Sequence, residues 1–262
     1  MNKINYFFGN GEYKDVLTCL STTPVNSYKT SSLPLADFWN PKNKELKTFI
    51  DKCKEKGLDL TEGSRYFEYP TPCYDKEKKK NLPSSQSSYT DLMIINDSIQ
   101  AAIECKYTEY SESVYQTIKD WNPNNEPYKN NIKAQWFKYI QECKATSKTV
   151  VNDNIPYQFL HRTASACFNC QNKKPVLIYQ VFYDEYNEKA KDIFIEDLAK
   201  WAKTLGLNQN ISFYVFEVRI KNIDKVKEKY NGIKSDLFLI MKELKKCLYE
   251  FDWEKIEIHK LI

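Results

Sequence analysis

Two apolar runs separated by a three-residue turn constrain this chain more than any other feature of its sequence. Residues 91–95 read Asp-Leu-Met-Ile-Ile, residues 99–106 read Ile-Gln-Ala-Ala-Ile-Glu-Cys-Lys, and the turn between them is Asn-Asp-Ser. Short apolar runs on either side of an Asn/Asp turn are typical of an antiparallel β-hairpin. The sequence therefore predicts a buried hairpin with a sheet built around it.

The short turn also predicts the register of the hairpin. Paired residues have numbers that sum to about 195, so Asp91 is expected opposite Glu104. Directly paired positions hold their Cβ atoms roughly 4.5–5.5 Å apart. Side chains alternate along a strand, so Lys106 shares a face with Glu104, while Ile103 and Cys105 point to the other face. Two acids and one lysine are therefore predicted at one end of one face.

This grouping has a direct chemical interpretation. Two carboxylates about 5 Å apart repel by roughly 3 kcal/mol at an effective dielectric near 20. A divalent cation reverses that repulsion, and Mg²⁺ or Mn²⁺ accepts oxygen ligands of this kind. We expect Asp91, Glu104 and the backbone carbonyl of Cys105 to hold the metal, with Lys106 orienting or deprotonating a metal-bound water. The alternative is an ordinary solvated hairpin.

The remaining elements read as a mixed α/β fold. Apolar stripes at helical spacing predict helices over residues 46–53 (ended by Gly57), 132–144, 157–168, 194–205 (ended by Gly206) and 237–248. Strands are expected at 65–69, 176–183 and 211–220, and a polar loop at 75–88. A strand, a helix and a strand in succession predict a right-handed parallel crossover after residue 176.

We expect one domain over residues 1–262. Its core would span about 42–220, with an insertion at about 107–156 and a basic helical part at 221–262. The net charge of +4 is mild, but the basic residues cluster. Residues 76–80 carry four lysines, and Arg219 to Lys246 carry nine lysines and arginines. Either cluster is compatible with DNA phosphates or with an ordinary solvated surface.

Composition removes several other classes of protein. No run of about 18 apolar residues and no secretory leader are visible, so a cytoplasmic protein without a membrane partner is expected. Eight cysteines in that setting indicate reduced thiols rather than a disulfide framework. With two histidines and no glycine-rich phosphate loop, histidine-based nuclease sites and motor or dinucleotide chemistry have little support.

The arrangement resembles the PD-(D/E)xK nuclease superfamily, the restriction-endonuclease-like fold. The matching residues are Asp91 at the start of one strand and Glu104-Cys-Lys106 at the end of the next, although threonine stands where proline often precedes the aspartate. The resemblance implies a central mixed β-sheet flanked by helices, with an αβββαβ core, an insertion and C-terminal helices. It also implies Mg²⁺-dependent hydrolysis of DNA, usually leaving a 5′-phosphate. Family members often add an acid from the first helix, for which Glu45 and Glu62 are candidates.

Some nucleases of this superfamily also carry Gln-x-x-x-Tyr on the helix after the lysine strand. Residues 135–139 have those letters, but Gln158 and Arg162 are better placed, just before the strand at 176. Gln158 is therefore expected to act with the catalytic residues. Arg162 is expected to clamp a phosphate, with His161 beside it and Ser88 as a further DNA contact. The alternative for each is an ordinary surface residue.

Cys167 and Cys170 form a lone Cys-x-x-Cys. A structural zinc site needs two more ligands, and some relatives in the superfamily hold an iron–sulfur cluster through four cysteines. Buried thiols are the simpler interpretation.

These observations lead to three functional hypotheses. The first is a Mg²⁺-dependent DNA endonuclease of type II restriction or defence type, working as a homodimer because duplex cutting needs two sites. A cognate methyltransferase would then be encoded nearby. The second is a structure-specific repair or recombination nuclease, and the third is a catalytically inactive DNA-binding module of the same fold.

Overall fold

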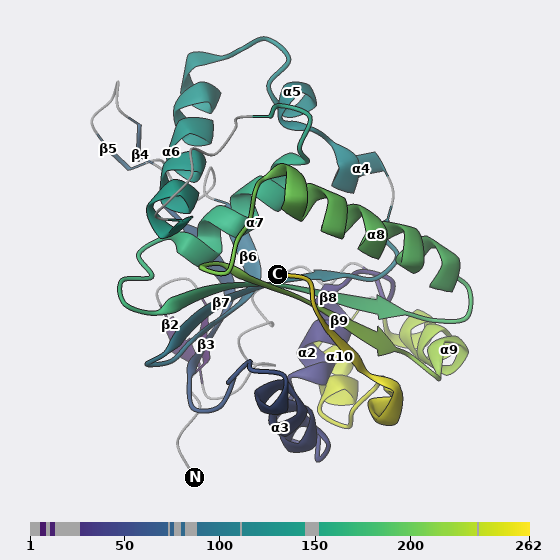
Figure 1. Cartoon of the computed structure of the whole chain (residues 1–262). Coiled ribbons are helices and arrows are strands. Elements are labelled where there is room, and N and C mark those ends of the chain that lie inside the picture. The colour runs from purple at the N-terminus through teal and green to yellow at the C-terminus, as the bar shows by residue number, and fades with distance from the viewer. Residues whose placement is uncertain are drawn as a thin grey trace.

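The predicted hairpin is formed, and it lies in the middle of a mixed β-sheet (Figure 1). The computed structural model describes residues 6–8, 11–13, 27–72, 74–75, 80–81, 88–110, 112–144, 152–234 and 236–262. The two strands, β6 (Ser88–Ile95) and β7 (Ile99–Lys106), are antiparallel, and Leu92 pairs with Ile103 as the turn predicts. Every residue of β7 is buried, so both faces of this strand are covered.

Neighbouring strands extend the sheet on both sides of the hairpin. Six strands follow the order β10-β9-β8-β7-β6-β3, and the short strands β1 and β2 continue it beyond β3. The pairs β7–β8, β8–β9 and β1–β3 are parallel and the others are antiparallel, so the sheet is mixed. The bounds are β1 (Tyr6–Phe8), β2 (Gly11–Tyr13), β3 (Ser64–Thr71), β8 (Lys174–Tyr183), β9 (Ser212–Arg219) and β10 (Glu257–Lys260).

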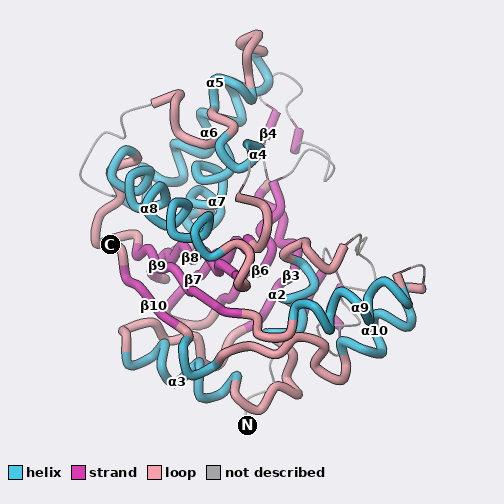
Figure 2. The backbone as a smooth tube through the Cα atoms, turned by 90° about the vertical axis from the view of Figure 1, so that its right-hand side faces the viewer, coloured by secondary structure: helices cyan, strands magenta, loops and turns pink. Residues whose placement is uncertain are grey.

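Helices cover both faces of the sheet, as Figures 1 and 2 show. One face packs on α2 (Ser32–Phe38), α3 (Leu46–Glu55), α9 (Ile223–Ile233) and α10 (Leu237–Leu244). The other face packs on α6 (Pro127–Lys144), α7 (Tyr157–Cys167) and α8 (Glu188–Thr204). The short elements are α4 (Glu112–Tyr115), α5 (Ile118–Trp121), a 3₁₀ turn at Trp253–Lys255 and a separate ribbon of β4 (Tyr74–Asp75) and β5 (Lys80–Asn81). The predicted mixed sheet flanked by helices is confirmed.

The sequence patterns explain why these elements form. The apolar stripe of α3 is buried, and Gly57 follows with a φ of 79°, a left-handed conformation that suits glycine at a helix end. Gly206 does the same after α8 with a φ of 64°. Nine of the ten residues of β8 are buried, as expected for a nearly continuous apolar run in a central parallel strand. The predicted β8–α8–β9 parallel crossover is present.

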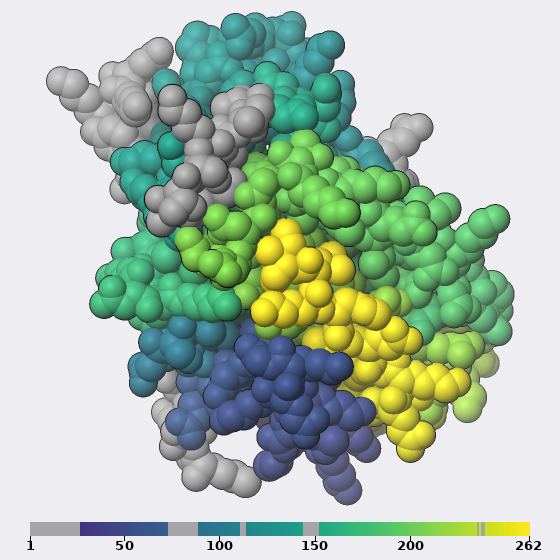
Figure 3. Space-filling model, in the orientation of Figure 1, coloured from purple at the N-terminus to yellow at the C-terminus, as the bar shows by residue number. Residues whose placement is uncertain are grey.

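The structure departs from the predictions mainly near the C-terminus. Residues 221–262 were expected to be helical, but the chain ends in β10, which pairs with β9. The helix predicted to reach residue 248 ends at Leu244, and Cys247 has a φ of 59°. In Figure 3 the C-terminal segment (yellow) fills the surface between α3 (blue) and α8 (green). Edge strands are short and partly polar, so their sequence signal is weak.

The loop predicted at 75–88 is only partly described. Residues 76–79 and 82–87 lie outside the described residues, and with them most of the basic run, whereas Lys80 belongs to β5. Within the described ranges, no helix combines the length and the apolar character needed to cross a membrane.

Asp37 in α2 provides a test of this packing. Its side chain is fully buried; Oδ2 accepts a hydrogen bond from the Tyr249 backbone at 2.6 Å, and Oδ1 has no partner. Burial raises the pKa of Asp37 from 3.8 to about 7. The folded protein therefore retains this proton between pH 4 and 7 while the unfolded chain releases it. Stability should fall by about 4 kcal/mol across that window.

Asp37→Asn should remove this pH dependence. The free energy of unfolding of the variant should equal that of the wild type near pH 4. It should become increasingly larger than the wild-type value up to about pH 7, and the variant should still be the more stable protein at pH 8. Urea unfolding at several pH values measures the difference. Asp51→Asn is the control, because Asp51 is half-exposed and forms only a surface ion pair. A difference between Asp37→Asn and wild type that is flat from pH 4 to 8 would contradict the expectation.

Candidate functional site

The hairpin brings the predicted acids and lysine together at one end of one face. Its register sets Asp91 opposite Glu104, and the backbone N–H of Cys105 donates to Asp91 Oδ2 at 2.7 Å. The Cys105 side chain packs in the core on the α3 side. Glu104 and Lys106 face α7 instead, so the predicted division of side chains between the two faces is confirmed.

Glu104 is held by two cations in the interior. Lys106 Nζ lies 2.8 Å from Oε1, and the Nε–H of Arg162 donates to Oε2. The exposed fractions of Glu104, Lys106 and Arg162 are only 2%, 7% and 9%. Burial opposes ionisation of Glu104, but Arg162 and Lys106 together lower its pKa. Burial likewise opposes the charge on Lys106, yet the nearby acids raise its pKa, so the amine stays protonated.

A third acid, Glu68 of β3, was not predicted. The β3–β6 ladder is paired on both sides of Glu68, at Phe67 and Tyr69, and its register puts Glu68 opposite Asp91. Glu68 has a φ of 48°, a left-handed conformation that is uncommon for a residue other than glycine. Such strained positions are concentrated at functional sites. Three neighbouring strands therefore each contribute one carboxylate, and with Lys106 and Arg162 we call these residues the acid site.

The acid site is electrostatically coupled. Burial raises the pKa of Asp91 well above its usual value, and the charge of Glu104 raises it further. Burial also raises the pKa of Glu68. The charge of Arg162 lowers this pKa, and the charge of Glu104 raises it. Asp91 and Glu68 are therefore reluctant to ionise beside an ionised Glu104, which is the condition that an added cation relieves.

Helix α7 brings the predicted DNA-contacting residues to this site. Arg162 reaches the acid site directly. His161 packs instead against the rings of Trp136 and Tyr157, with centroids 5.3 and 5.6 Å away, and burial and the neighbouring cations lower its pKa so that it stays neutral. Gln158, predicted to be catalytic, lines the adjoining cavity, and its Oε1 has no hydrogen-bond partner among the described residues.

The other predicted residues are placed away from the acid site or outside the described side chains. Gln135 of α6 donates to the Asn131 carbonyl at 3.4 Å and is not among the described residues that line the cavity. Glu45 precedes α3 and lines a different cavity, and Glu62 is exposed in the loop before β3. Ser88 begins β6, but its side chain lies outside the described part of the structure.

A cavity of about 360 Å³ opens onto the acid site. Glu68, Asp91 and Arg162 form its charged side. Its remaining walls come from β6, the insertion and α7: Tyr89, Trp121, Ile132, Trp136, Tyr157, Gln158 and His161. We call this space the aromatic cavity. It gives a ligand access to the carboxylates of Glu68 and Asp91. It could not be predicted from the sequence, because its walls come from four separate segments.

The acid site offers suitable but partly engaged oxygen ligands for a divalent cation. In Asp91, it is Oδ2 that accepts the Cys105 N–H. In Glu104, Oε1 is paired with Lys106 and Oε2 with Arg162, so both oxygens are already engaged. The carboxylates of Glu68, Asp91 and Glu104 do not all lie within 4.8 Å of one another. The predicted metal site of Asp91, Glu104 and the Cys105 carbonyl would therefore need Glu104 to leave Arg162 or Lys106 before it could bind a cation.

A second cluster has closer ligand geometry. Among the described residues, Glu217, Glu257 and His259 place their ligand atoms within 4.8 Å of one another on β9 and β10. Glu217 is also paired with Lys191 at 2.5 Å, so its charge is already balanced. This cluster lies outside the acid site and competes with it as a candidate metal centre.

The Cys-x-x-Cys pair lies at the end of α7, near a third thiol. Cys143 Sγ is 3.3 Å from Cys170 Sγ, and Cys167 and Cys170 are buried. All three are free thiols, and they do not form a group with the metal-ligand spacing given above.

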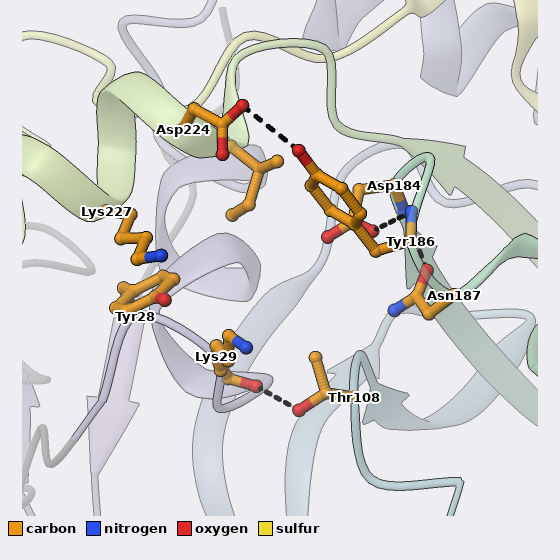
Figure 4. A pocket seen from close by; sticks show the side chains of 9 residues that line it. Tyr28, Lys29, Thr108, Asp184, Tyr186, Asn187, Asp224 and Lys227 are labelled. Atoms are coloured by element: carbon orange, nitrogen blue, oxygen red, sulfur yellow. Dashed lines mark hydrogen bonds between the residues drawn. The ribbon is translucent and has the colours of Figure 1, made fainter.

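A larger cavity of about 470 Å³ lies at the ends of β7 and β8 (Figure 4). Lys29 and Lys227 line it together with Asp184 and Asp224, and Tyr186 donates to Asp224 at 3.2 Å. Its charges are balanced, and none of the residues of the acid site lines it.

In a comparison with known protein families, residues 14–242 match a family described as a domain of unknown function, DUF6946. The chain belongs to this family. The match covers β3, the hairpin, α7, β8 and β9, and so includes the whole acid site of this DUF6946 protein. Neither the curated proteins nor the solved structures contain a match.

Proposed function

We propose that this DUF6946 protein is a Mg²⁺-dependent nuclease that hydrolyses DNA phosphodiester bonds at the acid site. The observation that carries the proposal is the convergence of Glu68, Asp91 and Glu104 from three adjacent strands, with buried Lys106 and Arg162, beside an open cavity. A sheet that served only structure would not gather like charges at one point.

The balance of charge supports a divalent cation. Three carboxylates face two cations, so the fully ionised site has one excess negative charge. A DNA phosphodiester adds a second, and one divalent cation neutralises both. Bound to Asp91, Glu104 and the Cys105 carbonyl, Mg²⁺ (or Mn²⁺) would act as a Lewis acid and lower the pKa of a coordinated water.

The protein side chains then have distinct roles. Because Lys106 is protonated, it would orient the attacking water and stabilise charge on the phosphate rather than act as the base. Arg162 would release Glu104 and bind a phosphate oxygen of the DNA instead, because a guanidinium binds phosphate well. The attacking water loses one proton to solvent as its oxygen bonds to phosphorus. The bond from phosphorus to the 3′ oxygen breaks, and the leaving oxygen takes up one proton from solvent. The products are a 5′-phosphate and a 3′-hydroxyl.

The order of the elements supports the resemblance to the PD-(D/E)xK superfamily. The chain follows α3, β3, β6, β7, α7 and β8, with the small ribbon and the insertion between them. This is the αβββαβ order that the resemblance implies. A type II restriction or defence nuclease, working as a homodimer beside a neighbouring methyltransferase, is the first form of this proposal. A structure-specific repair or recombination nuclease is the second form, and both go with a cytoplasmic location.

One observation favours a second candidate, a DNA-binding module without catalysis. Both oxygens of Glu104 are engaged by Arg162 and Lys106. If these ion pairs persist when DNA and metal are present, Glu104 cannot serve as a ligand.

A cleavage assay separates the two candidates. Plasmid DNA, single-stranded oligonucleotides and duplexes with one unpaired nucleotide would be offered as substrates. The full chain should cut at least one of them when Mg²⁺ or Mn²⁺ is present and stop cutting when EDTA removes the metal. The new ends should accept ligation directly, as 5′-phosphates do. Salt-dependent DNA binding with no cleavage across varied DNAs and metals would favour the binding module.

A further inference from the structure

Aromatic side chains make the aromatic cavity an unusual neighbour for a phosphodiester site. Trp121 and Tyr157 are stacked, with centroids 5.9 Å apart and an interplanar angle of 13°. Trp136 adjoins Trp121 at 5.3 Å, and His161 adjoins Trp136 at the same centroid distance. Four rings from α5, α6 and α7 thus line one space. Ring faces are the surfaces on which nucleobases stack.

Two polar atoms in these walls have no partner within the part of the chain that the structure describes. There, the Nε1–H of Trp136, a residue only 4% exposed, donates to no acceptor, and Gln158 Oε1 accepts from no donor. Buried polar groups are usually hydrogen-bonded. The two residues that carry this donor and this acceptor both line the cavity, so a ligand that offers both kinds of group would satisfy them once the side chains turn towards it. The edge of a nucleobase carries donors and acceptors side by side.

Size and position limit what this ligand can be. At about 360 Å³ the cavity is near the lower end of the range for small-molecule pockets, roughly 300–1,000 Å³. It suits one nucleotide unit rather than a base pair. Its charged side contains Asp91 and Arg162, so a base stacked against the aromatic wall would have its own phosphate beside the acid site. A base in an intact duplex is stacked and paired, and it must leave the helix to enter such a pocket.

We infer that the aromatic cavity binds one unpaired nucleobase next to the phosphate to be cut. The substrate is then DNA with a single-stranded, mismatched or extruded nucleotide, and perfectly paired duplex is a poor substrate. This inference rests on the nuclease function proposed above and names its substrate class. It favours the structure-specific nuclease over the restriction enzyme.

Binding measurements on a full-length Asp91→Asn protein test this inference without cleavage. Fluorescence anisotropy would compare a labelled single strand, its perfect duplex, and the same duplex with one unpaired nucleotide. The single strand and the unpaired duplex should bind at least 10-fold more tightly than the perfect duplex. Adding Trp121→Ala should weaken binding to the single strand by about 10- to 100-fold, the effect of losing one stacking ring.

Two further variants make the result interpretable. Trp136→Phe keeps a ring in the wall and removes the unpaired N–H, so it should fold and weaken the single-strand complex by about 5- to 10-fold. Tyr128→Ala removes an exposed aromatic side chain from α6 outside the cavity and should change binding less than twofold. Equal affinity for all three DNAs, with no effect of Trp121→Ala, would overturn the inference while Asp91-dependent cleavage left the nuclease proposal standing. No binding and no cleavage of any DNA would overturn both.

Discussion

Replacing Asp91 with asparagine should abolish DNA cleavage while leaving the protein folded and at least as stable as the wild type. The amide oxygen can still accept the Cys105 N–H, so the local hydrogen bond survives. The negative charge that would share a cation with Glu104 is lost. We expect cleavage to fall by at least ~10³-fold, as when a principal group that stabilises the transition state is removed. Single-turnover cleavage of an oligonucleotide measures the loss.

The stability of Asp91→Asn has a predictable pH dependence. The pKa of Asp91 is raised in the folded protein by burial first and by Glu104 next, so the folded state holds this proton more tightly than the unfolded chain. Stability of the wild type is therefore lost as pH rises from about 4 towards the folded pKa. Over that range the stability of the variant should increase relative to that of the wild type. A variant that instead becomes less stable than the wild type as pH rises would show that the aspartate is stabilised as an anion.

Replacing Arg162 with methionine should strongly destabilise the folded protein. The guanidinium is 9% exposed and pairs with Glu104, which is 2% exposed. Its removal leaves a buried carboxylate with Lys106 as its remaining cation. Breaking such a pair costs about 3–5 kcal/mol, which lowers the melting temperature of a chain of this size by on the order of 10 °C. Thermal and urea unfolding at neutral pH measure the change.

The pH profile and a double variant identify the cause. In the wild type the pKa of Glu104 is lowered by Arg162 and Lys106 despite burial, so the stabilisation from this pairing is present above about pH 4.5 and is lost as pH falls. The deficit of Arg162→Met should therefore shrink at acidic pH, and adding Glu104→Gln should recover much of it at neutral pH. Lys200→Met, which breaks an exposed pair with Asp197, should cost less than about 1 kcal/mol. A double variant whose loss of stability equals the sum of the losses in Arg162→Met and Glu104→Gln would show that the unpaired Glu104 carboxylate is not the cause.

The hairpin could be predicted because every feature that defines it is local. Three turn residues join β6 and β7, so the register followed from counting, and alternation then separated Glu104 from Cys105. The central strand β8 was predictable from its apolar run, and the ends of α3 and α8 from Gly57 and Gly206. In each case one short segment carries the whole signal.

Glu68 could not be found in the same way. The strand around it was predicted, but the long connection between β3 and β6 leaves their register undetermined by sequence, so nothing placed Glu68 opposite Asp91. Its left-handed φ is also invisible in the letters, because glutamate rarely adopts it. The two candidates from the first helix region, Glu45 and Glu62, lie elsewhere. The third acid of the site is therefore identified only by the pairing of two segments that are distant in the sequence.

The aromatic cavity is a further case of non-local structure. Trp121 and Trp136 belong to an insertion for which the sequence predicted only approximate bounds and one helix. Their partners Tyr157 and His161 come from α7, and only folding of the insertion onto that helix brings the four rings together. Periodicity predicts that each helix exists, but not which rings meet across two of them.

Binding of Mn²⁺ to the full chain with a short single-stranded oligonucleotide, followed by electron paramagnetic resonance of the free ion, tests the metal assignment most directly. Wild type and Glu257→Gln should both bind Mn²⁺, whereas Asp91→Asn and Glu104→Gln should lose that binding. Retention of Mn²⁺ by Asp91→Asn and Glu104→Gln, together with its loss in Glu257→Gln, would move the metal to the cluster on β9 and β10 and contradict a nuclease centre at the acid site.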